Sequence, residues 1–319
     1  MSRAYRIGLL GVGPMAAQHA RAIGAVDGLE ISTSISRDPA KAKVFAAEHG
    51  IGRSCGLAEF LESPDVDGIY AVVPADSMSA VAVDLNKLGL PLFLEKPVGL
   101  SPAETRHACD LITVPHMVGM NRRFYEIIQQ GKKLLQDSGG VTGIEIQMPE
   151  FIRELDTRYG KHILEAWMYG NSIHLIDLFR YFAGEPSEIH PLQSRRSWHD
   201  RSVVASLAFG SGALGVFHAH WGAPGGWRVT VSARDLQIVF QPIEKALVLQ
   251  RGKENVSLLP EGADKVLKAG LYGEAEAFRN LIDTGRLSSP AADMPDYLKS
   301  VDLVGRLFDG NNGTEASGT

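Results

Sequence analysis

Two oppositely charged residues stand at the end of an apolar run. The run Leu90-Pro91-Leu92-Phe93-Leu94 has the composition of a buried strand, and Glu95-Lys96-Pro97 follows it directly. Charges in such a place cost free energy unless they are paired or used. Open α/β sheets bind ligands at the carboxyl ends of their strands. Lys96 is therefore a candidate for catalysis and for binding a substrate and a cofactor, and Glu95 is a candidate for binding a cofactor. A structural Lys96–Glu95 ion pair is the alternative.

A second candidate pair lies on an apolar segment later in the chain. Residues 173–182 have the composition of a buried helix, and they include His174 and Asp177. Three residues apart, these two share one face of the helix. Polar groups in such surroundings are expected to be buried, paired or functional. A histidine there can also be a satisfied core group, and Asp177 can do no more than hold its tautomer.

A glycine-rich turn near the start of the chain indicates a dinucleotide site. The strand predicted for residues 5–10 is followed by Gly11-Val12-Gly13-Pro14-Met15-Ala16 and then by a helical segment. In this context Gly11 allows a tight turn, and Gly13 allows the backbone to approach a diphosphate. The free N–H groups at the helix start attract the anion, and we expect Pro14 and Met15 there to contact the cofactor. A chance glycine turn is the alternative.

The end of the second predicted strand, residues 29–35, bears on the choice of cofactor. An NAD-selective site places an acidic residue there, whereas this chain has Ser36-Arg37, which suits a 2′-phosphate. We therefore favour NADP(H) over NAD(H), which stays open because Asp38 follows. Asp38 can instead cap the next helix, and Arg37 can be a solvated turn residue. We also expect two further residues to line the cofactor: Lys41, in the next predicted helix, and Pro74, at the end of the third predicted strand.

The order of predicted elements divides the chain into two domains. Up to residue 121, strand and helix alternate five times, which is typical of a doubly wound parallel sheet of the Rossmann type. Residues 122–309 combine a few helices with a run of strands separated by glycine turns, which predicts an α+β domain with a large, mostly antiparallel open sheet in meander order. We expect residues 310–319 to be a disordered tail.

Composition excludes several classes of partner. The net charge is −5 and the charged fraction is 22%, which argues against nucleic acid and anionic membrane as ligands. The two cysteines, Cys55 and Cys109, form no disulfide framework, and we expect a cytoplasmic protein without a membrane span. His218 and His220 share a face of one predicted strand, but with no third ligand evident we expect no metal site.

Taken together, the motifs resemble one family over nearly the whole chain, the glucose–fructose oxidoreductase, inositol dehydrogenase and MocA (Gfo/Idh/MocA) family. The matching stretches are as follows: Gly11–Ala16, Ser36-Arg37-Asp38, Glu95-Lys96-Pro97, Asn121-Arg122-Arg123-Phe124, Ile173–Leu178 and Tyr272–Phe278. The resemblance implies hydride transfer between NAD(P) and a hydroxyl or keto carbon of a sugar, cyclitol or nucleotide-linked sugar. It also implies a homo-oligomer, dimer or tetramer, formed through the open sheet.

The same resemblance assigns roles to individual residues. Lys96 would polarise the reacting oxygen, and His174 would give or take the proton with Asp177 behind it. Arg123 and Asn171 would contact the substrate, and Glu95 would orient the lysine or the cofactor.

Two departures from the family pattern bear on these roles. The family often has an aspartate four residues before the histidine, where this chain has Gly170. The family's Pro-Asn-x-x-His appears as Pro74-Ala75-Asp76-Ser77-Met78. The resemblance therefore leaves two alternatives open: a non-catalytic sensor that binds NAD(P) and a sugar, and an enzyme that recycles a bound cofactor.

Overall fold

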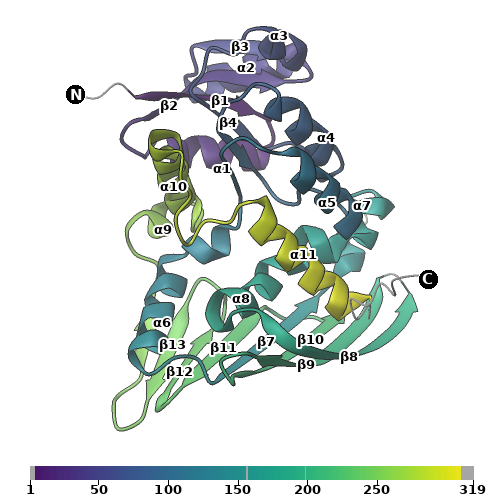
Figure 1. Ribbon diagram of the computed structural model, residues 1–319, viewed down its shortest axis with the longest axis vertical. Helices are drawn as coiled ribbons and strands as arrows, with labels where there is room; N and C mark the ends of the chain where they lie inside the picture. The colour runs from purple at the N-terminus through teal and green to yellow at the C-terminus, as the bar shows by residue number, and fades with distance from the viewer. Residues whose placement is uncertain (1–3, 156, 198, 310–319) are drawn as a thin grey trace. The chain divides into compact units, whose positions relative to one another are not determined.

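The computed structural model describes residues 4–155, 157–197 and 199–309 (Figure 1). The described residues form two compact units, one of residues 4–125 and 261–298 and the other of the described residues from 126 to 260 and from 299 to 309. The first boundary lies close to the expected one after residue 121. The continuous second domain is not found, because residues 261–298 return to the first unit. The predicted tail, 310–319, lies outside the described residues.

The first unit is built on a six-stranded parallel sheet in the order β3-β2-β1-β4-β5-β6. This is the Rossmann-type arrangement expected from the alternation of strands and helices. The strands are β1 (Tyr5–Leu10), β2 (Leu29–Ser36), β3 (Arg53–Gly56), β4 (Gly68–Ala71), β5 (Leu92–Leu94) and β6 (His116–Val118). The short β3 was not predicted, since Arg53-Ser54-Cys55-Gly56 lacks the usual apolar or β-branched composition. Glu95-Lys96-Pro97 therefore follows the fifth strand along the chain.

The helices of the first unit begin and end at readable signals. Pro14 opens α1, and the Asp38 side chain accepts a hydrogen bond from Ala40 N at 3.0 Å to cap α2. Gly50, with φ of 67°, ends α2 in the left-handed region. The helices up to residue 125 are α1 (Pro14–Ile23), α2 (Pro39–His49), α3 (Leu57–Glu62), α4 (Ala75–Asn86), α5 (Pro102–Leu111) and the 3₁₀ turn η1 (Asn121–Phe124).

The returning segment completes the core of the first unit. It contains α9 (Gly262–Val266), α10 (Leu271–Thr284) and the start of α11 (Met294–Phe308). Phe278 of α10 packs edge-on against Tyr70, whose ring stacks on Phe93 with centroids 4.1 Å apart. Val118 N also donates to Ala292 O at 2.8 Å, which adds a bridge at the sheet edge. Burial of these apolar groups explains why the segment leaves the second unit.

The second unit is built on an eight-stranded sheet in the order β14-β13-β12-β11-β7-β10-β9-β8. The prediction of a mostly antiparallel sheet is confirmed, and the predicted meander holds within β8–β10 and within β11–β14 but is interrupted between β10 and β11. The early strand β7 inserts between β10 and β11, and it pairs with β10 in parallel. The strands are β7 (Gly143–Glu150), β8 (Pro186–Ser197), β9 (Asp200–Phe209), β10 (Leu214–Trp221), β11 (Arg228–Ala233), β12 (Leu236–Phe240), β13 (Ala246–Gln250) and β14 (Val256–Leu258).

One face of this sheet is covered by helix and the other carries exposed apolar groups. The helical elements are α6 (Glu126–Asp137), the 3₁₀ turn η2 (Ile152–Leu155), α7 (Lys161–Glu165), the π-helical turn η3 (Met168–Ser172) and α8 (Ile173–Ala183). Phe179 of α8 packs against Phe209 and Phe217 of the sheet. On the opposite face Val204, Leu214 and Val216 are 44%, 65% and 49% exposed. Among the described residues, none of the helices is long and apolar enough to cross a membrane.

Candidate functional site

The glycine loop has the geometry that a dinucleotide requires. Gly11 has φ of 124°, and a Cβ there would lie 2.0 Å from Val72 O, so only glycine fits. Gly11 N donates to Ile35 O at 2.9 Å, which ties the loop to the end of β2. A Cβ built on Gly13 meets nothing within 4 Å, so the backbone at the start of α1 is open to a ligand. These features fit the diphosphate of a dinucleotide.

A hollow of about 310 Å³ lies next to this loop, lined by Val12 and by residues of α2 from Ala40 to Glu48, including Lys41. Arg37 is exposed at the end of β2, where the 2′-position of a bound ribose is expected. Asp38 is used as the cap of α2, which was one of the alternatives left open by the sequence. Ser36 Oγ accepts from Asp38 N at 3.3 Å and shapes the same turn.

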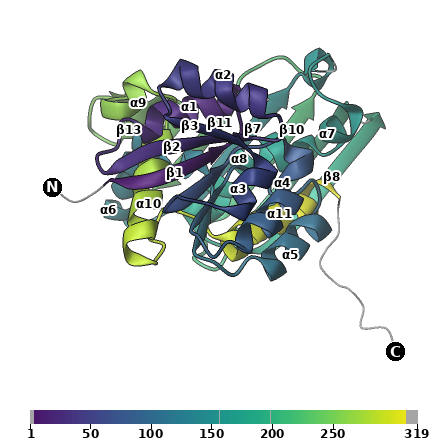
Figure 2. The same cartoon turned by 90° about the horizontal axis from the view of Figure 1, so that it is seen from above.

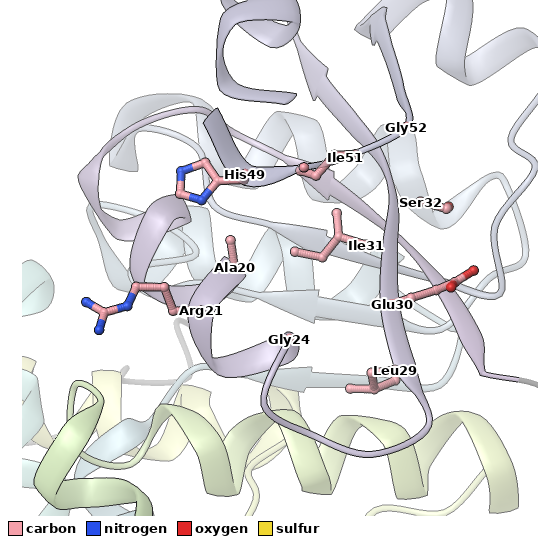
Figure 3. Close-up of a pocket in the computed structure, with 11 residues that line it drawn as sticks. Ala20, Arg21, Gly24, Leu29, Glu30, Ile31, Ser32, His49, Ile51 and Gly52 are labelled. Atoms are coloured by element: carbon pink, nitrogen blue, oxygen red, sulfur yellow. The ribbon is translucent and has the colours of Figure 1, made fainter. Parts of the chain in front are cut away.

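A larger hollow of about 720 Å³ lies elsewhere on the first unit (Figure 3). It is lined by the C-terminal ends of α1 and α2 and the first half of β2, with Arg21, Glu30 and His49 among its polar residues. None of the sequence-predicted site residues lines it. The candidate cofactor residues instead gather at the opposite, carboxyl end of β2 and its neighbours.

Lys96 lies half-buried just after β5, at the carboxyl edge of the same sheet as the glycine loop. Burial lowers the pKa of Lys96 from 10.5 to about 8. Glu95 opposes this shift in pKa, whereas the nearby cations Arg122 and Lys268 add to it. Lys96 is therefore mainly a cation at neutral pH, but it holds its proton far less tightly than a solvated lysine.

Glu95 is fixed by a partner that the sequence reasoning missed. Its Oε2 lies 3.0 Å from Nε2 of His19, a residue of α1 that is only 1% exposed. The His19 ring lies edge-on to Phe93, with centroids 5.2 Å apart. The sequence signal that could have indicated this contact is a histidine within the helix that follows the glycine loop. The contact orients Glu95 at the carboxyl end of β5.

Glu274 is a second carboxyl group in this region, also missed as a site residue. It is fully buried, and neither of its oxygens has a hydrogen-bond partner among the residues that the structure describes. Burial raises its pKa well above 4.5, and the negative charge of Glu95 raises it further. Phe278, one helical turn later, places this face of α10 against Tyr70 and Phe93. The sequence signal that could have indicated Glu274 is its place in the family motif Tyr272–Phe278.

Arg123, predicted to contact substrate, forms an ion pair. Its Nη1 lies 2.6 Å from Oδ2 of Asp296, and the arginine is only 6% exposed. The pair ties η1 to the first turn of α11. Such a contact is consistent with a structural role for Arg123.

In the second unit His174 and Asp177 are both buried on α8, as the pattern predicted. Asp177 Oδ1 accepts a hydrogen bond from Ser300 Oγ at 2.6 Å and lies 3.6 Å from Nη1 of Arg180. Arg180 in turn donates to Ser300 Oγ at 2.6 Å and, through Nε, to Glu185 at 2.9 Å. We name this group, Asp177, Arg180, Glu185 and Ser300, the α8 ion-pair cluster.

The turn η3, just before α8, contains Gly170 and Asn171. Asn171 Nδ2 and Ser172 Oγ each donate to Glu150 Oε1 at 3.3 Å, and Trp167 Nε1 also donates to this carboxylate. Glu150, at the end of β7, is a carboxylate that the sequence reasoning missed, and it contacts the two residues that follow Gly170. A Cβ at Gly170 meets nothing within 4 Å.

The structure thus brings together the glycine loop, Arg37, Lys41, Pro74, Glu95 and Lys96 at one edge of one sheet. His174, Asp177 and Asn171 belong to the other unit, and the pairing of Lys96 with His174 stays a prediction. His218 and His220 have ring centroids 5.4 Å apart. No group of three or more potential metal ligands occurs in the described part of the chain.

Comparison with known proteins gives two family-model matches. Residues 5–118 match the model of an oxidoreductase family with an NAD-binding Rossmann fold, and residues 129–239 match the GFO/IDH/MocA C-terminal domain. The chain is 30% identical to the rhizopine catabolism protein MocA of Rhizobium meliloti over 129 residues, 40% of each chain. It is 27% identical to an inositol 2-dehydrogenase of Corynebacterium glutamicum over 192 residues, 58% of this chain and 56% of that one.

These alignments span between about two fifths and three fifths of the length of the curated relatives. A solved structure of levoglucosan dehydrogenase with NADH and levoglucosan superposes with a TM-score of 0.78 at 19% identity, covering 96% of this chain and 97% of that one. At this identity the likeness establishes the fold.

Proposed function

Since the chain belongs to the Gfo/Idh/MocA family of NAD-binding oxidoreductases, we propose that it is a dehydrogenase or reductase. It transfers a hydride between a nicotinamide cofactor and a hydroxyl or keto carbon of a sugar, cyclitol or nucleotide-linked sugar. The observation that carries the proposal is Lys96, whose pKa is lowered to about 8 by burial. It stands at the edge of the sheet whose first strand ends in the glycine loop. Perturbed groups at such an edge are characteristic of catalytic sites.

The cofactor, when bound, supplies the hydride donor or acceptor, and the remaining chemistry belongs to the chain. The Lys96 ammonium stabilises negative charge on the reacting oxygen. His174 gives or takes the hydroxyl proton. Asp177 is a positioning residue on the same helix, and Asn171 is oriented by Glu150 so that its amide oxygen is available to a substrate hydroxyl.

We propose NADP(H) as the preferred cofactor, with NAD(H) as the alternative. The support is Arg37, exposed at the carboxyl end of β2, together with Asp38, whose carboxylate is used to cap α2. Binding of NADPH and NADH, followed by fluorescence, tests the preference. Arg37→Ala should weaken NADPH binding and leave NADH binding nearly unchanged, and an equal loss for both would contradict the proposal.

The exposed face of the second unit's sheet supports a homo-oligomer. Leu192 of β8 lies opposite Val204 of β9, and both are exposed. Leu214 and Val216 of the next strand, β10, are exposed on the same face. The face therefore presents apolar groups across several neighbouring strands, which is typical of an interface. Light scattering after size-exclusion chromatography should give a dimer or tetramer, and Val216→Glu should shift it toward monomer. A monomeric wild-type protein would contradict this part of the proposal.

Turnover tests the function as a whole. The purified protein is assayed with NAD⁺, NADP⁺, NADH and NADPH against panels of inositols, aldoses and the corresponding ketones. Turnover that Lys96→Met lowers by about a hundredfold or more, and that the exposed Lys87→Met leaves intact, supports hydride transfer assisted by Lys96. Cofactor binding without turnover on any panel member would favour the sensor instead.

A further inference from the structure

A lysine outside the glycine loop reaches across to it. Lys268 lies on the segment that returns to the first unit, between α9 and α10, and its side chain is exposed. Its Nζ lies 3.1 Å from Sδ of Met15, in the first turn of α1. This turn begins at Gly13, where the backbone is open to a ligand. The sequence reasoning gave Lys268 no role.

The backbone next to Lys268 is fixed beside Asn121, at the end of β6. Asn121 Nδ2, just after β6, donates to Ala269 O at 3.2 Å. Gly270 N donates to Asp264 Oδ1 at 2.8 Å. Gly270 has φ of 81°, and a Cβ there would lie 2.2 Å from Asn121 O, so a close backbone contact fixes this position. Residues 269–270 therefore lie beside the end of β6, and the Lys268 side chain extends from there to the start of α1.

Between those two points lie the carboxyl ends of β4 and β5, where Glu95 and Lys96 stand. The positive charge of Lys268 acts at this edge, because it helps to lower the pKa values of both Lys96 and Glu274. The ammonium is thus in contact with the start of α1 and close enough to Lys96 to act on its pKa. A dinucleotide bound across this edge would carry its two negative phosphates along the same line.

We propose that Lys268 is a cofactor-binding residue, which closes over the diphosphate of the dinucleotide from the side opposite the α1 amide groups. The proposal rests on the proposed function, since it presupposes a dinucleotide on the glycine loop. Lysine acts on phosphate as a mobile point charge, and a long, exposed side chain on a fixed backbone suits that use. Lys268 thereby gives the returning segment a part in cofactor affinity.

The test compares two lysines three residues apart. Lys265 is exposed in the last turn of α9 and serves as the matched control. In titrations of the full chain with NADPH and NADH, Lys268→Met should raise the dissociation constant about tenfold, as expected for one exposed charge contact with a phosphate. Lys265→Met should leave it unchanged, and Lys268→Arg, which keeps the charge, should stay within about threefold of wild type.

Two further probes locate the contact on the diphosphate. ADP-ribose, which lacks nicotinamide, should show the same loss with Lys268→Met as the full cofactor does, whereas adenosine should show none. Thermal unfolding of each variant confirms that the fold is kept, and Lys268→Arg restores binding if charge is what matters. Equal dissociation constants for Lys268→Met and Lys265→Met would overturn the inference and leave the proposed function standing. Failure of the wild-type protein to bind any dinucleotide would overturn both.

Discussion

Two buried polar regions in the described part of the chain differ in how many of their polar groups have hydrogen-bond or ion-pair partners. In the first unit the charge of Glu95 acts on the pKa values of both Lys96 and Glu274, and Glu274 is buried without a hydrogen-bond partner among the described residues. In the second unit each charge of the α8 ion-pair cluster has an oppositely charged or hydroxyl partner, at 2.6 to 3.6 Å for Asp177.

This difference separates positions that serve chemistry from positions that serve stability. A buried pair with good geometry holds a fold in one arrangement, and breaking one partner leaves an uncompensated charge. A buried carboxyl group without a hydrogen-bond partner, such as Glu274 among the described residues, costs stability and is retained where charge must change during function. On this comparison the first unit carries the electrostatic part of the proposed reaction, and Asp177 is mainly an anchor for α8.

The largest expected effect is that of Lys96→Met on turnover. Removing the ammonium removes the charge that stabilises the reacting oxygen, so kcat/KM should fall by about 10²- to 10³-fold, the range found for loss of one electrostatic donor. Stability in urea should not fall, because a partly desolvated charge is replaced by an apolar side chain of similar length. Steady-state kinetics and urea unfolding of the same preparation check both statements, and a loss of stability with turnover retained would reverse the assignment.

The next effect concerns the stability of the second unit. Asp177→Ala leaves Arg180 buried with one acceptor fewer, and the free energy of unfolding should fall by about 2 to 4 kcal/mol. Glu185→Gln is the matched control in the same cluster. The Glu185 side chain is 55% exposed, so this change should cost about 1 kcal/mol or less. Equal losses for the two variants in urea unfolding would mean that the α8 cluster is not held by its buried member.

Sequence reasoning identified the parts of this molecule that local patterns encode. The glycine loop, Lys96 and the buried His174–Asp177 face each follow from residue types at fixed spacing. The position of β7 and the return of residues 261–298 could not be predicted in this way. Both depend on which apolar surfaces meet across long stretches of chain, as Phe278 meets Tyr70. The partners brought by that return, Glu274 and Lys268, were missed for the same reason.

A third prediction concerns Glu274 and pH. Because its pKa in the folded protein is raised above the ordinary 4.5, the folded state binds the proton more tightly than the unfolded chain does. The wild-type protein therefore loses stability relative to Glu274→Gln as the pH rises above 4.5, by up to about 1.4 kcal/mol per pH unit until the folded carboxyl ionises. Urea unfolding of both proteins at pH 5 and pH 7 measures the divergence. Parallel stability curves would show that Glu274 is not held protonated.

The smallest effect tests how the first cluster sets the charge of Lys96. If the ammonium form assists turnover, kcat/KM should decline on the alkaline side with a midpoint near the pKa of about 8. Arg122 is one of the cations that lower this pKa, so Arg122→Gln should move the midpoint to higher pH, by roughly one unit or less. Arg106, exposed on α5, is the control, and Arg106→Gln should leave the midpoint in place. A midpoint that is unchanged in Arg122→Gln would mean that the alkaline decline of kcat/KM reports the titration of a group other than Lys96. The difference between the two polar regions would then give no reason to place the electrostatic part of the reaction in the first unit.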